Sequence, residues 1–171
     1  MGVKEVADII GRIADGFEGA LMDCMRDNSS IVVELIKEQL WAGQYGDGKP
    51  LSPSYDADPF FDEPGHWYNN AKGYIIWKRS ITPPSSGVML GLPPRPDNIP
   101  NLFIDGTFYK EINISEGANM LVTDPGSGNG PDIEEKYGDR LLDMGPDAKE
   151  YFNRALMIPA IEKFFKDCGY K

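Results

Sequence analysis

The only histidine of the chain, His66, carries the side chain that most readily exchanges a proton near neutral pH. It closely follows Asp62 and Glu63, and a carboxylate beside a histidine is a common arrangement for general-base catalysis. A nucleophilic mechanism would also need an activated Ser or Cys, and the sequence contains no G-x-S-x-G motif. We interpret His66 as a loop or helix-cap histidine, and keep a small hydrolase that uses His66 with a nearby carboxylate as the enzymatic alternative.

A glycine-rich segment, residues 43–50, has the G-x-x-x-x-G-K spacing of phosphate-binding loops. Such a loop needs Ser or Thr after the lysine to hold Mg²⁺, and this chain has Pro50 there. The segment also follows a predicted helix, whereas a phosphate-binding loop follows a strand and opens a helix. The pattern therefore favours a chain-reversing turn without a bound cofactor.

Two acidic segments could supply oxygen ligands to a cation such as Ca²⁺. Asp56, Asp58, Asp62 and Glu63 lie close together in the sequence, but their spacing matches no EF-hand loop. The loop 124–132 places glycines where side-chain ligands would be needed. We predict no metal site, although a cation held by acidic loop residues stays open.

The first part of the chain, residues 3–42, has the periodicity of two helices. Apolar residues recur every three or four positions up to Met22, and Asn28-Ser29-Ser30 interrupts the pattern with residues that cap helices. A second helix is predicted from Ile31 to Trp41, ending at Gly43. The pair predicts an N-terminal α-hairpin, and the glycines of the first helix predict close packing against a neighbour.

Residues 43–100 hold 10 of the 14 prolines and 7 of the 19 glycines. Proline stiffens a chain and removes a hydrogen-bond donor, so two long extended loops are expected around a helix from Trp67 to Arg79. Bulky apolar residues interrupt these loops, which a disordered linker would lack. We predict an arm-like insertion that packs on its own core or on another subunit. Its candidate inter-subunit contacts are Phe60, Phe61, Trp67, Tyr68, Trp77, Leu90 and Leu92.

The last part, residues 101–171, mixes both kinds of element. An apolar run surrounds the turn signal Asp105-Gly106, two segments at 111–115 and 120–123 alternate as strands do, and a short helix is expected near 133–137. A final helix begins near Pro146 and is interrupted by Pro159. The prediction is one α+β domain over 1–171, with a small antiparallel β-sheet, a C-terminal helix and long loops rich in Pro and Gly.

The charge and the cysteines limit the function. The chain has 171 residues and a net charge of −10, which disfavours a protein that grips nucleic-acid phosphates. Charged residues break the N-terminal apolar pattern, so no secretory signal or membrane span is expected. Cys24 and Cys168 are predicted to be buried thiols of a protein made inside the cell, with a disulfide as the minor alternative. The excess of acidic residues over 124–150 indicates a solvated face or a surface that selects a basic partner.

Several short strings, taken together and in order, carry a resemblance. They are Glu38-Gln39-Leu40-Trp41-Ala42-Gly43, Gly48-Lys49-Pro50-Leu51-Ser52-Pro53-Ser54-Tyr55, Tyr74-Ile75-Ile76-Trp77-Lys78, Asn101-Leu102-Phe103-Ile104-Asp105-Gly106-Thr107-Phe108-Tyr109 and Tyr137-Gly138-Asp139-Arg140-Leu141-Leu142. The set resembles structural proteins of tailed bacteriophages, especially crAss-like phages, and is more loosely similar to head–tail connector, neck and tail-completion proteins. The proline-rich insertion at 82–100 departs from the compact connectors.

This resemblance implies a virion component made in the cytoplasm of a host bacterium. It implies a non-enzymatic ring protein of the neck or tail that contacts copies of itself and the neighbouring portal, neck or tail proteins. DNA would pass through the ring without specific binding, and no cofactor or membrane would be involved. The third alternative is an accessory protein that interacts with a host protein.

Overall fold

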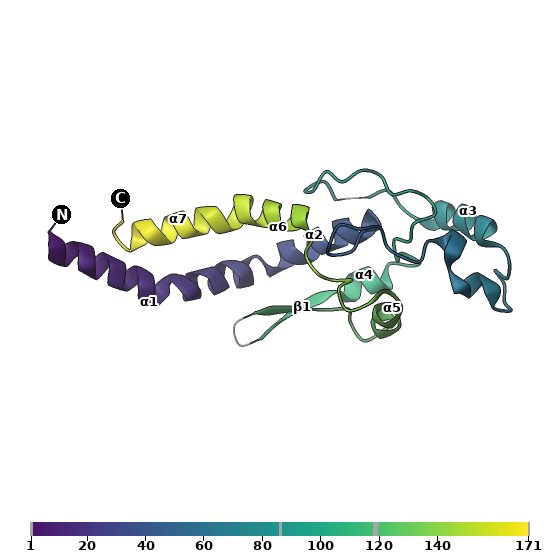
Figure 1. The fold of residues 1–171 in the computed structure, drawn as a ribbon, viewed down its shortest axis with the longest axis horizontal. Helices are drawn as coiled ribbons and strands as arrows, with labels where there is room; N and C mark the ends of the chain where they lie inside the picture. Colours follow the sequence, from purple (N-terminus) through teal and green to yellow (C-terminus); the bar gives the residue numbers. More distant parts are fainter. Residues whose placement is uncertain (1, 86, 118–119, 171) are drawn as a thin grey trace.

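The computed structural model describes residues 2–85, 87–117 and 120–170, and it confirms the α+β class. The molecule is long, and its two halves differ (Figure 1). One half is a pair of antiparallel helices, α1 (Val3–Asp27) and α7 (Ile158–Asp167), which end with both termini at the same tip. The other half holds the core, the sheet and the long loops. We call the paired helices α1 and α7 the stalk.

The core is built around α2 (Ser29–Trp41). Leu35, Ile36 and Leu40 are completely buried, at spacings that place them on one face of the helix. Residues distant in sequence pack on this face, including Leu51, Phe108, Leu141 and Phe152. Gly43, with a φ of +71°, ends the helix as predicted, because its left-handed backbone conformation favours glycine.

The antiparallel packing that was predicted between the two N-terminal helices is made mainly between α1 and α7 instead. Both N-terminal helices exist, but α2 continues beyond the end of α1, and the long antiparallel neighbour of α1 is α7 (Figure 1). The prediction of close packing at the α1 glycines holds only at Gly16, where an added Cβ would lie 3.0 Å from the Phe164 ring. Gly11 and Gly19 face open space. The sequence pattern identified an apolar face but not which helix would cover it.

The segment 43–100 contains two 3₁₀ turns, η1 (Tyr55–Ala57) and η2 (Pro59–Asp62), and one helix, α3 (Ala71–Ile81). The predicted start of this helix at Trp67 is four residues too early. Asn70 caps α3 by accepting a hydrogen bond from the Gly73 amide, and Asn69 before it has a φ of +51°. Periodicity alone extended the helix across this cap.

The two predicted strands form a β-hairpin. β1 (Asn113–Glu116) pairs antiparallel with β2 (Leu121–Asp124), with Ile114 opposite Thr123. The Asp105-Gly106 turn opens a short helix, α4 (Thr107–Glu111), because the Asp105 carboxylate accepts a hydrogen bond from the Thr107 amide. The predicted short helix near 133–137 is α5 (Gly130–Tyr137).

The C-terminal helix is interrupted as predicted. α6 (Pro146–Phe152) continues through a π-helical turn, η3 (Asn153–Met157), into α7. Pro159 comes directly after that turn, where the wider backbone accommodates the missing N–H. The helix continues past Pro159, and α7 packs along α1.

Cys24 and Cys168 are both free and buried, as predicted. The Asn28 side-chain amide contacts Cys24, whereas the Cys168 carbonyl accepts hydrogen bonds from the Arg12 guanidinium. Within the described part of the chain, no helix is both long enough and apolar enough to cross a bilayer.

One buried side chain, Gln39 of α2, connects the core to the loop before α6. Only 2% of Gln39 is exposed; its amide Nε2 donates to the Asp143 carbonyl at 3.0 Å, and its Oε1 accepts from the Gly145 amide at 2.7 Å. Each hydrogen bond joins residues more than 100 positions apart in the sequence, so the pair fixes a long-range contact. An amide is suited to this position because it donates and accepts at once.

We expect Gln39→Leu to lower the free energy of unfolding by about 3 kcal/mol, because two backbone groups lose their buried partner while the volume hardly changes. The measurement is urea denaturation followed by circular dichroism. Gln44→Leu is the matched control, since that side chain makes no hydrogen bond within the described residues. Equal stability of the two variants would contradict this role.

Candidate functional site

A cluster of aromatic side chains organises η1, η2 and α3. The Tyr74 ring lies at its centre, 5.0 Å from the ring of Tyr55, 5.3 Å from that of Phe61 and 5.4 Å from that of Trp67. The ring planes of these three pairs meet at 65° to 87°, the edge-to-face geometry that aromatic quadrupoles prefer. The cluster therefore gives this proline-rich segment a small core of its own.

Beneath this cluster lies Lys78, the most unusual residue of the protein. Only 1% of Lys78 is exposed, and its Nζ has no hydrogen-bond partner among the described residues. Burial lowers the pKa of Lys78 to about 7, and the nearby positive charge of Arg95 acts in the same direction. This amine therefore loses its proton at a much lower pH than an exposed lysine does.

A cavity of about 250 Å³ adjoins this lysine. Its wall includes Tyr55, Phe61 and Tyr74 on one side and Tyr137 of α5 on the other. The Asp58 carboxylate also lines the cavity, where it accepts a hydrogen bond from Lys136 at 2.6 Å, so it is neutralised by that lysine. This site combines an amine that has no hydrogen-bond partner among the described residues with aromatic walls.

The loop from Thr82 to Pro100 folds back onto α2 through one carboxylate. The two Glu38 oxygens accept hydrogen bonds from the backbone amides of Met89 and Leu90, each at 3.0 Å. Gly87 lies so close to Glu38 that a Cβ there would be 2.0 Å from its side chain. This contact places Met89 and Leu90 at the rim of an open groove.

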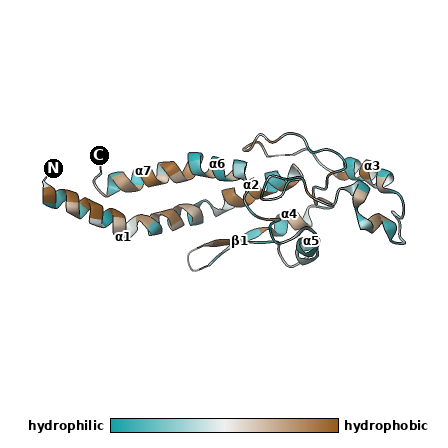
Figure 2. Cartoon of the chain, viewed as in Figure 1, coloured by the Kyte–Doolittle hydropathy of each residue, from teal (hydrophilic) through white to brown (hydrophobic). Residues whose placement is uncertain are grey.

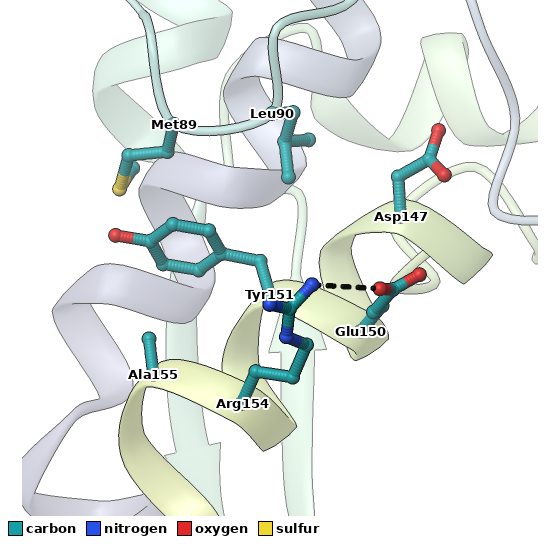
Figure 3. Close-up of a pocket in the computed structure, with 7 residues that line it drawn as sticks. All are labelled: Met89, Leu90, Asp147, Glu150, Tyr151, Arg154 and Ala155. Atoms are coloured by element: carbon teal, nitrogen blue, oxygen red, sulfur yellow. Dashed lines mark hydrogen bonds and ion pairs between the residues drawn. The ribbon is translucent and has the colours of Figure 1, made fainter.

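The groove has a volume of about 540 Å³ and separates this loop from α6 (Figure 3). Tyr151 points across it toward Met89, while Arg154 turns to Glu150, with 3.3 Å between their charged atoms (Figure 3). Both partners of this ion pair are mostly exposed, so the pair adds little stability. The groove is polar at one edge and apolar at the other.

The seven predicted inter-subunit residues fall into three environments. Phe60 and Tyr68 are 49% and 53% exposed and can meet a neighbour. Trp67, Trp77, Leu90 and Leu92 are half-buried in the chain's own fold. Phe61 is only 5% exposed and belongs to the aromatic cluster. Segment 43–100 thus packs in large part on its own chain, and its role as an inter-subunit arm stays a prediction.

The other candidate residues lie apart. Segment 43–50 is a turn, closed by a hydrogen bond of 2.8 Å that the Tyr45 backbone amide donates to the Lys49 carbonyl. His66 is exposed, packs its ring against Trp67, and makes no hydrogen bond to Asp62 or Glu63 in the described chain. The Gly126–Gly128 loop holds the Glu111 carboxylate, which accepts from the Gly128 amide at 2.9 Å. Among the described residues, no cluster of His, Cys, Asp or Glu could hold a metal ion.

Lys78 and Glu38 stand out in the structure, by burial and by hydrogen bonding, but were not predicted from the sequence. Lys78 lies in the apolar string Tyr74–Lys78 of a predicted helix, and its place after Trp77 was the only available signal. Glu38 has the appearance of an ordinary surface charge in the sequence.

Comparison with known proteins yields no match: no protein-family model, no curated protein and no solved structure corresponds to this chain. The site must therefore be interpreted from its own geometry.

We expect Lys78→Met to raise the free energy of unfolding at pH 7 by about 2 kcal/mol, because a buried amine without a partner is replaced by an apolar side chain of similar length. The folded-state pKa of Lys78, about 7, lies below the ordinary 10.5, so between these values the unfolded chain binds more protons. Wild-type stability should therefore rise with pH through this window, relative to the variant, by about 2 kcal/mol from pH 7 to pH 9.

Urea denaturation at both pH values measures this difference. The same substitution at exposed Lys72, on the same helix, is the control and should change stability little at either pH. If the free energy of unfolding changed equally with pH in wild type and in Lys78→Met, the lowered pKa of a buried Lys78 amine would be refuted.

Proposed function

We propose that this chain is a structural protein of a tailed-phage virion, which assembles with copies of itself into a ring of the neck or tail. In this role it joins the portal or head to the tail and lines a conduit for DNA. It works without a cofactor and without catalysis, and exposed residues of segment 43–100 such as Phe60 and Tyr68 contact neighbouring subunits.

The observation that carries this proposal is the amount of exposed surface. The chain exposes 10439 Å² for a mass of 19.0 kDa, whereas a compact monomer of this mass exposes about 8,400 Å². The excess of about 2,000 Å² is comparable to what one subunit contributes to an extensive permanent interface. An extended subunit of this kind is typical of a component whose remaining surface is covered by neighbours.

The net charge of the chain supports a DNA conduit. The net charge is −10 per chain, and a ring multiplies that value by its copy number. A negative lumen repels the phosphate backbone, so DNA can slide through without being held. The resemblance of the sequence to phage structural proteins favours the virion over other assemblies.

The direct test is mass spectrometry of purified virions of the phage that encodes the chain. We expect peptides of this protein at a fixed stoichiometry relative to the portal protein, and electron microscopy of particles should place it between head and tail. Absence of the chain from purified particles would overturn the proposal, and fixed-stoichiometry binding to a host protein would support the accessory alternative. Ala substitution of His66 should leave infectivity unchanged; loss of infectivity with normal particle assembly would favour the hydrolase alternative.

A further inference from the structure

Helix α1 carries two rows of apolar side chains along its length, which we call the first and second seam. A helix that packs against a single neighbour needs only one such row. The first seam, spaced four, three and four residues apart, consists of Ile9, Ile13, Gly16 and Ala20. The second seam, with the same heptad spacing, consists of Val3, Ala7, Ile10, Ala14 and Phe17. With 3.6 residues per turn, the two seams lie about 110° apart around the helix. A helix with two such seams is built to pack against two neighbours.

The first seam is covered by α7. Ile9 is 5% exposed and faces Gly169, and Gly16 lets the Phe164 ring approach closely. Arg12 closes the contact by donating to the Cys168 carbonyl at 2.6 Å. This seam therefore holds the stalk together within one chain.

The second seam is open along most of its length. Val3 is 91% exposed, Ile10 is 60% exposed, and Ala7 and Ala14 are also exposed. Only its far end is partly covered, where Phe17 stacks on Phe165 at 6.1 Å and stays 36% exposed. Figure 2 shows hydrophobic colouring along the outer part of α1, at the end away from the core. A row of apolar side chains in water marks an interaction surface.

The side chains of the second seam alternate in size. Val3, Ile10 and Phe17 are seven residues apart, and Ala7 and Ala14 lie between them. Two copies of this row can therefore interdigitate, with large side chains of one over alanines of the other. Such self-complementarity is what an isologous contact requires, in which the same surface of two identical subunits meets. A membrane surface fits less well, because the strip beside the seam carries Asp8, Asp15 and Glu18, which anionic lipids repel.

We propose that the second seam of α1 is a self-association surface, occupied by the stalk of a second copy of this chain. The inference rests on the proposed function in that both require copies of the chain to meet. It assigns one such contact, between the same faces of two stalks, to Val3, Ala7, Ile10, Ala14 and Phe17. The excess surface of about 2,000 Å² per chain leaves ample area for such a contact.

The test compares two glutamate substitutions on α1. Ala14→Glu places a charge in the second seam, and Gly11→Glu places the same charge on the polar strip, where an added side chain meets open space. Both variants change the net charge equally, so general repulsion between chains is matched. Ile10→Gln adds a polar but uncharged change in the seam.

Light scattering coupled to size exclusion, over a wide range of concentrations, measures the association. We expect the wild-type chain to form a multiple of the monomer, Ala14→Glu and Ile10→Gln to weaken association at least about tenfold, and Gly11→Glu to resemble wild type; a tenfold change corresponds to about 1.4 kcal/mol. Circular dichroism should show equal helix content in all four proteins.

Each contrary outcome has a separate meaning. Association that survives Ala14→Glu and Ile10→Gln overturns the seam and leaves the ring proposal standing. A wild-type chain that stays monomeric, or that is captured only by phosphatidylglycerol vesicles, also overturns the seam, while the presence of the chain in virions still decides the proposed function. Loss of association in Ala14→Glu with absence from virions keeps the seam and rejects the phage ring.

Discussion

Two adjacent side chains of α2, Glu38 and Gln39, hold the rest of the core half in place. Glu38 binds the backbone of the loop that contains Met89 and Leu90, and Gln39 binds the loop that leads into α6. Gln39 is buried on the same face of α2 as Leu35, Ile36 and Leu40, so its hydrogen bonds lie inside the apolar core. Because α6 is positioned by Gln39, and α7 follows α6 through the π-helical turn, the direction of the stalk also depends on α2. One helix therefore sets both the core and the path of the C-terminal chain.

The stalk is different, because among the described residues it is a single layer of two helices, α1 and α7. Two helices in contact bury only one stripe of each, so stability of the stalk relies on Ile9, Gly16 and Phe164, and on the Arg12 bond to the Cys168 carbonyl. The ion pair of Arg26 with Glu116 of β1, at 2.6 Å, is exposed and contributes little. A two-helix layer with apolar residues left in water gains stability when a further helix covers it, so the proposed contact with a second copy would stabilise the stalk.

Local signals in the sequence predicted most elements, because caps and periodicity act over a few residues. The two N-terminal helices, the strands of the hairpin and the interruption before Pro159 were all visible in this way. The pairing of α1 with α7 could not be predicted in this way, because an apolar stripe indicates that a helix needs a neighbour but not which segment that neighbour is. The start of α3 was also misplaced, since Asn70 as a cap overrides the apolar pattern that begins at Trp67. The partners of each helix depend on the whole chain, so local secondary-structure propensity cannot predict them.

The candidate site shows the same division between local and long-range information. The aromatic residues of 60–77 are recognisable by type, whereas the cavity beside Lys78 is lined by residues as distant in sequence as Tyr137. Lys78 and the second seam of α1 are both places where the chain leaves a physical requirement unmet. They differ in that the seam is on the surface, where a second subunit can cover it, whereas Lys78 is enclosed by its own chain. A neighbour can therefore stabilise the stalk by contact, but relief at Lys78 must come from loss of its proton or from a group small enough to enter the cavity.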